Sequence, residues 1–140
     1  MQEKGMTAEE IATLLYRQSG LLGVSGISND MAALEVSDDP QAREAIELFC
    51  YRAARELTAL ATDMGGLGAI VFTAGIGENS ALVRRLICER LAWLGVDLDD
   101  AANASSANKI HSTASSVDVL VIPTDEEAVI ARATRSLTAS

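Results

Sequence analysis

The chain has 140 residues, of which 49% are hydrophobic, so it can bury the core of one domain and lacks the composition of a disordered segment. Its net charge of −9 argues against nucleic acids and anionic membranes as partners, and any phosphate site must depend on backbone donors, a metal ion or cations from elsewhere. No segment has the length of a membrane span and the N-terminus lacks a secretory apolar stretch, so we expect a cytoplasmic protein with Cys50 and Cys88 as buried thiols.

The first half of the chain predicts two helices joined by a loop. Residues 7–10 have the pattern of a capping box, which opens a helix that ends near Gly20 and carries an apolar stripe (Ile11, Leu14 and Leu15). Small residues predict a loop over 21–30. Asp39-Pro40 predicts the start of the longest helix, which ends at Gly65-Gly66. Its expected core positions repeat at helical spacing: Ile46, Phe49, Ala53, Leu57 and Leu60.

The second half alternates strands and helices. Residues 69–73 read as a buried strand, apolar without alternation, as in parallel strands that are covered on both faces. A tight turn over 74–77 and a helix over 79–93, closed by Gly95, follow. The expected core positions of that helix are Leu82, Leu86, Leu91 and Trp93.

A short helix from Asp99 or Asp100 through Asn103 precedes a Ser- and Ala-rich loop over 104–116. We expect an edge strand at 110–113 within that loop, and we interpret His111 as a surface residue without a function. A second buried strand is predicted over 117–122, and a last helix over 125–137.

This order of elements indicates α/β architecture. Two buried strands and one edge strand form a poor sheet for so many helices. We therefore expect further strands upstream of Met1.

Ligands of open α/β sheets bind beyond the carboxyl ends of the strands, which directs attention to the segment 72–80. Gly75 and Gly77 permit positive φ and let a ligand approach the backbone, and the following helix start offers N–H groups. A tight strand-to-helix turn with no ligand explains the same spacing. Ser80 stands where a Rossmann fingerprint needs its third glycine, and the chain has no Gly-Lys-Ser or Gly-Lys-Thr, so a P-loop is excluded.

Two further segments have site-like chemistry. After the second strand, Thr124 and Glu127 fit a capping box, which leaves Asp125 and Glu126 without a structural task. A carboxylate there could hold Mg²⁺, although acidic residues also suit a helix N-terminus. The segment 25–31 ends in Asn-Asp and alone predicts a turn and a helix cap.

Together, residues 19–31 (SGLLGVSGISNDM), 71–79 (VFTAGIGEN) and 121–132 (VIPTDEEAVIAR) resemble acetate kinases, the acetokinase family. The resemblance covers nearly the whole chain. It implies the carboxy-terminal half-domain of an actin-like ATPase (ribonuclease H-like) α/β fold, helix-rich with a small sheet. Residues 1–140 would then form one partial domain.

The resemblance implies a Mg²⁺-dependent reaction in which ATP and acetate give ADP and acetyl phosphate. Matching residue by residue assigns nucleotide contacts to Asp30, Met31, Ala32, Gly75, Ile76, Gly77, Glu78 and Asn79, and the magnesium-associated carboxylate to Glu126. Two positions depart from the family. Ala32 replaces a usual arginine, which removes a cation near the nucleotide, and Ala74 replaces a common glycine, which would stiffen the turn.

Family chains are much longer, and the resemblance is to their carboxy-terminal part, so their acetate pocket and catalytic residues would lie upstream. No catalytic residue is assigned here, the carboxylate substrate would need that upstream part, and we expect the chain alone to be inactive. The resemblance also implies a homodimer. Two alternatives stay open: a non-catalytic module that binds nucleotide or dimerises, and a kinase of propionate or butyrate.

Overall fold

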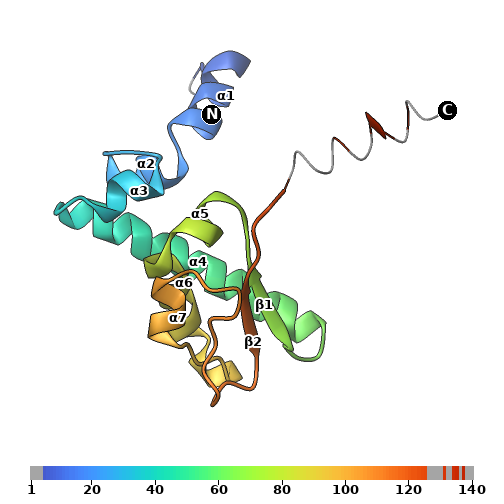
Figure 1. The fold of residues 1–140 in the computed structure, drawn as a ribbon. Helices are drawn as coiled ribbons and strands as arrows, with labels where there is room; N and C mark the ends of the chain where they lie inside the picture. The colour runs from blue at the N-terminus through green and yellow to red at the C-terminus, as the bar shows by residue number, and fades with distance from the viewer. Residues whose placement is uncertain (1–4, 126–130, 132–133, 136, 138–140) are drawn as a thin grey trace.

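The computed structural model describes residues 5–125, 131, 134, 135 and 137 (Figure 1). A small parallel sheet packs against helices, as the α/β prediction requires. The helices are α1 (Ala8–Arg17), α2 (Gly20–Ser25), α3 (Met31–Glu35), α4 (Pro40–Asp63), α5 (Ala74–Asn79), α6 (Ala81–Arg90) and α7 (Asp100–Ala104), with a 3-10 turn η2 (Ala92–Leu94); the strands are β1 (Ala69–Phe72) and β2 (Asp118–Val121). No described helix is long and apolar enough to cross a membrane.

Helix α4 is the longest element and begins where the sequence predicts. Asp39 Oδ1 accepts a hydrogen bond from the Gln41 N–H at 2.8 Å, and Pro40 occupies the first turn. The helix packs against α2, α3 and α6. The prediction that Leu60 belongs to the core is wrong, because the buried stripe is built largely from smaller side chains that allow close helix packing: Ala42, Ala45, Ile46, Cys50, Ala54 and Ala61.

The N-terminal region differs from the prediction in two ways. The capping box of α1 is present, but the expected apolar stripe is not buried, since α1 buries no residue and projects from the rest of the chain (Figure 1). The start of the expected loop over 21–30 is instead helix α2. Gly20 (φ 61) and Gly26 (φ 66) adopt left-handed conformations at the two ends of this helix, so these glycines bound a helix rather than indicating a loop.

The two strands pair in parallel, with Ile70 opposite Val119 and Phe72 opposite Val121. These four side chains are buried against the helices. The expectation that both faces of the first strand are covered is wrong for the described part of the chain: burial alternates along β1, and Val71 is 49% exposed. Described helices cover one face of the sheet, and the other face is open.

A segment around Lys109 runs antiparallel along the second edge of β2. The Ile110 N–H donates to the Val119 carbonyl, and the Val121 N–H donates to the Asn108 carbonyl, both at 2.9 Å. The edge strand predicted over 110–113 is reduced to isolated bridges at Lys109 and His111.

Two helices, rather than a tight turn and one helix, follow β1. Residues 74–79 form α5, and Ser80 then caps α6 by accepting a hydrogen bond from the Val83 N–H at 3.0 Å. Helix α6 ends at Arg90, and Gly95 closes η2 with φ 88, as predicted for that glycine. Trp93 is not a core residue: it is 70% exposed, because the chain leaves the helical face after Leu91.

The remaining predictions concern the last part of the chain. Asp99 caps α7 as expected, and both cysteines are buried free thiols. His111 is not a surface residue: its side chain is 18% exposed, and Nδ1 accepts the Val119 N–H at 3.0 Å. The predicted helix over 125–137 falls mostly outside the described residues.

Candidate functional site

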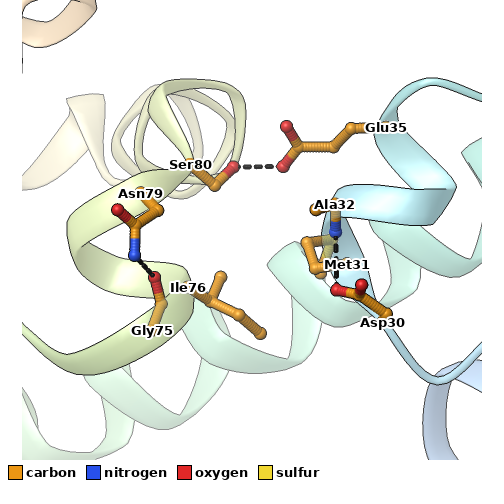
Figure 2. A pocket seen from close by; sticks show the side chains of 8 residues that line it. All are labelled: Asp30, Met31, Ala32, Glu35, Gly75, Ile76, Asn79 and Ser80. Carbon is orange, nitrogen blue, oxygen red and sulfur yellow. Dashed lines mark hydrogen bonds between the residues drawn. The ribbon is translucent and has the colours of Figure 1, made fainter.

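Two segments that are far apart in the sequence line one pocket of about 290 Å³ (Figure 2). One side comes from α3 and the residue before it, and the other from α5 and the residue after it. The lining residues are Asp30, Met31, Ala32, Glu35, Gly75, Ile76, Asn79 and Ser80. Six of the eight predicted nucleotide contacts are therefore brought together, and Gly77 and Glu78 lie outside the lining.

The α3 side of the pocket is held by a helix cap. Asp30 Oδ1 accepts the Ala32 N–H at 3.0 Å, as the sequence predicts for an Asn-Asp turn. Met31 is buried, and its side chain lies between α3 and the α5 side (Figure 2). Glu35, which the sequence argument missed, accepts a hydrogen bond from the Ser80 hydroxyl across the pocket. It shares a helix face with Met31 four residues earlier, so recognising α3 as a helix would have found it.

The two glycines of α5 have different structural tasks. A Cβ on Gly77 would lie 3.3 Å from the Phe72 carbonyl carbon, so this glycine allows α5 to pack on the end of β1. A Cβ on Gly75, which lines the pocket, would meet nothing within 4 Å. Neither glycine has positive φ. Ala74 has it instead, with φ 57, which corrects the expected role of the glycines.

The charges of the pocket favour a neutral or hydrogen-bond-donating group over a phosphate. Two carboxylates, Asp30 and Glu35, line it, and its described lining contains no lysine or arginine. Ala32 stands where the resemblance leads us to expect arginine. The start of α5 also offers fewer free N–H groups to a ligand than expected, because the Ala74 N–H already donates to Thr124 Oγ1 at 3.1 Å.

Arg84, a residue of helix α6 that is 0% exposed, holds helix α5 in place. Its Nη1 donates to the Gly77 carbonyl at 2.9 Å and to the Glu78 carbonyl at 2.8 Å, at the C-terminal end of α5. Its Nε and Nη2 donate to the side chain and carbonyl of Asn103 on α7, both at 2.8 Å. No pattern in the sequence predicts this role, since an arginine on an amphipathic helix usually faces solvent.

Glu78 takes part in a different contact from the one expected. Its Oε1 accepts the Thr124 N–H at 2.8 Å and the Thr124 hydroxyl at 3.1 Å. The hydrogen bond from the Thr124 backbone lowers the pKa of the Glu78 carboxyl below its usual value. The expected capping partner of Thr124, Glu127, lies outside the described residues.

The predicted magnesium carboxylate, Glu126, also lies outside the described residues, so that assignment stays a prediction. Within the part of the chain that the structure describes, no group of three or more His, Cys, Asp or Glu side chains is arranged to hold a metal ion.

Comparison with known proteins supports the resemblance that the motifs suggest. The model of the acetokinase family matches residues 1–132. An acetate kinase of Rhodopseudomonas palustris is 60% identical over 134 residues, which cover 94% of this chain and 34% of that protein. The chain thus spans about a third of the length of the curated relatives it matches.

Solved structures show the same likeness. Porphyromonas gingivalis acetate kinase matches with a TM-score of 0.86 at 34% identity, over 99% of this chain and 36% of that one. A propionate kinase from Francisella tularensis matches with a TM-score of 0.84 at 39% identity, over 94% of this chain and 34% of that one. The helix-rich fold with a small parallel sheet, expected from the resemblance to actin-like ATPases, is confirmed. The chain belongs to the acetokinase family, the carboxylate kinases to which its three motifs pointed.

Proposed function

We propose that this chain forms the nucleotide-binding wall of a phosphotransferase that, in a protein of the family's full length, converts ATP and acetate to ADP and acetyl phosphate. The observation that supports the proposal is the meeting of residues 30–32 with Gly75, Ile76 and Asn79 around one pocket. On this proposal residues 1–140 are one partial domain from the carboxy-terminal part of the enzyme.

The chemistry of the pocket suits the nucleoside half of ATP or ADP. Ala32 and Ile76 offer apolar surface to a base, while Asp30 and Glu35 offer oxygen atoms to ribose hydroxyls or to an amino group. The phosphates need positive charge, which the described lining lacks. Mg²⁺, held through Glu126, would supply part of that charge. We expect no phosphoryl transfer by the chain alone, because stabilising the transferred phosphoryl group requires cations.

Calorimetric titration of ADP into the purified chain, with and without Mg²⁺, tests the proposal. We expect binding in the micromolar to millimolar range that is strengthened by Mg²⁺. A folded chain that binds no ADP under either condition would contradict the assignment of the pocket.

A pair of glycine variants separates binding from folding. Gly75→Ala adds a methyl group to a residue that lines the pocket and removes a helical glycine, so we expect unchanged or higher stability with ADP binding weakened about tenfold. Gly77→Ala forces a contact with the end of β1, so we expect it to lower the free energy of unfolding by about 1 kcal/mol or more. Unchanged ADP affinity in Gly75→Ala would count against the pocket.

The magnesium assignment has a similar matched pair. Glu126→Ala should remove the Mg²⁺-dependent gain in ADP affinity. Glu127→Ala is the matched control and should leave that gain intact, because the Thr124 N–H and hydroxyl, which a capping box with Glu127 would use, are bonded to Glu78 and Ala74 instead. Equal effects of the two variants on binding would contradict this division.

The acyl substrate is not assigned by this chain. Its identity to the solved propionate kinase, 39%, is similar to its 34% identity to the solved acetate kinase. Propionate or butyrate therefore stays an alternative to acetate, and rates with the three carboxylates, measured on a full-length protein, distinguish them.

A module that binds nucleotide or dimerises without catalysis is the remaining alternative. The apolar surface at Val71 and Trp93 favours association with another chain. Size-exclusion chromatography with light scattering tests the homodimer that we propose, and a monomer at all concentrations would contradict it.

A cytoplasmic location stays a prediction.

A further inference from the structure

A cluster of hydrogen bonds joins the carboxyl ends of β1 and β2 beside the pocket. Thr124 Oγ1 lies 2.7 Å from Thr73 Oγ1, 3.1 Å from the Ala74 N and 3.1 Å from Glu78 Oε1. The Thr124 N–H adds a fourth bond, to the same Glu78 oxygen at 2.8 Å. We call this cluster the Glu78–Thr124 latch.

The latch uses the whole bonding capacity of one hydroxyl. A threonine hydroxyl has one proton to donate and two lone pairs to accept. The Thr124 hydroxyl donates to Glu78, accepts from the Ala74 N–H, and accepts from the Thr73 hydroxyl. Because each partner fits one donor or acceptor position, valine at 124 would lose three bonds while keeping its shape.

The latch also acts on the one strained backbone position of α5. Ala74 is held at φ 57, a conformation that costs an alanine roughly 1–2 kcal/mol, and its N–H is bonded to Thr124. The next two residues, Gly75 and Ile76, line the pocket. The orientation of this pocket wall therefore depends on a bond from a residue that does not line the pocket.

We propose that Glu78 and Thr124 are positioning residues: they lock the start of α5 to the end of β2 and so hold the Gly75-Ile76 wall in place against α3. This assignment deepens the proposed function and rests on it. It also replaces the direct nucleotide contact that sequence matching gave to Glu78, whose carboxylate is bonded to Thr124 instead.

Nucleotide affinity tests the latch at a temperature where every variant is fully folded by circular dichroism. Thr124→Val and Glu78→Ala should each weaken ADP binding at least about tenfold, because each removes a bond to a charged group. The double variant should be no worse than either single one, since both disrupt one unit. Glu78→Gln, which keeps an acceptor for the Thr124 N–H, should recover part of the loss. Thr113→Val, an exposed threonine upstream of β2, is the matched control and should bind like the unmodified chain.

Amide chemical shifts of the nucleotide-free chain test the latch independently of the proposed function. Thr124→Val should shift the amide signals of Gly75 and Ile76 and, across the pocket, of Met31. Shifts confined to Thr73, Ala74 and Glu78, the direct partners of Thr124, would overturn the positioning role. If the unmodified chain binds no ADP but Thr124→Val still shifts the amide signals of Gly75, Ile76 and Met31, the proposed function is contradicted. The positioning role of the latch is then still supported. Additive losses in the double variant would also overturn the latch.

Discussion

Ala74 shows how a single residue can carry strain that the sequence pattern assigns elsewhere. Glycines 75 and 77 drew the prediction of positive φ, yet both adopt ordinary conformations and the left-handed position falls to Ala74. The sequence did mark the site, because alanine there departs from the glycine common in the family. It could not show which of the neighbouring residues carries the unusual backbone, since that depends on how α5 packs on β1.

Ala74→Gly should raise the free energy of unfolding by about 0.5–1 kcal/mol, because relief of the left-handed strain exceeds the entropy that glycine adds to the unfolded chain. Urea denaturation measures the change. Ala59→Gly, on the exposed side of α4, is the control and should cost about 1 kcal/mol. Two losses of similar size would show that residue 74 is not strained.

The two cysteines should be unreactive while the chain is folded. Burial raises the pKa of the Cys50 thiol to about 11 and that of Cys88 to about 12, so almost no thiolate is present at pH 8. A thiol reagent should label neither residue in buffer and both in urea. The same shifts make stability independent of these thiols below pH 9 and reduce it as pH rises from 9 towards 11. Rapid labelling of the folded chain at pH 8 would contradict the buried positions.

Among the elements, the helix starts marked by Thr or Asp caps were predictable, whereas helix α2 and the break between α5 and α6 were not. Thr7, Asp39 and Asp99 each begin a helix as expected, because their side-chain oxygens accept a hydrogen bond from an otherwise unpaired N–H of the first turn. Helix α2 was missed because glycine is equally common in loops and at helix ends. The break between α5 and α6 was missed because the sequence pattern placed Ser80 inside one helix. In the structure Ser80 caps α6, and its hydroxyl also donates a hydrogen bond to Glu35.

Helix α5 is stabilised through its C-terminal carbonyl groups, which makes Arg84 a sensitive position. Arg84→Met would leave the Gly77 and Glu78 carbonyls and the Asn103 side chain without their donor, and should cost roughly 2–4 kcal/mol in urea denaturation. Arg85→Met is the matched control on the same helix. The Arg85 side chain is 49% exposed and lies 3.9 Å from Glu89, so its loss should change stability by less than about 0.5 kcal/mol. Similar costs for the two variants would rule out the role given to Arg84.

At the scale of the whole molecule, the segments that line the candidate pocket could be identified from the sequence, but their meeting around one pocket could not. The family motifs identified both sides of the pocket, but no pattern in the chain required Asp30 to lie near Gly75. Glu35, Arg84 and the contacts of Thr124 depend on how separate elements pack, and sequence spacing does not report that packing. The exposed face of the sheet was likewise unexpected, because apolar strands usually have cover on both sides.

The single tryptophan reports whether the exposed apolar surface is covered in solution. Trp93 is 70% exposed in the single chain, so its fluorescence should be red-shifted and readily quenched by acrylamide in the folded monomer. Unfolding in urea should change the emission little. A blue-shifted emission that moves to the red on dilution would show instead that another copy covers Trp93.

The parallel pairing of β1 with β2 has a consequence for the order of events in folding. The chain must run through α5, α6 and α7 before the strands can meet, and Thr73 contacts a residue 51 positions away. Closing so long a loop is slow compared with forming a helix. In stopped-flow refolding we therefore expect helical circular dichroism to recover first and the capacity to bind ADP to recover last, with Thr124→Val altering only the later phase.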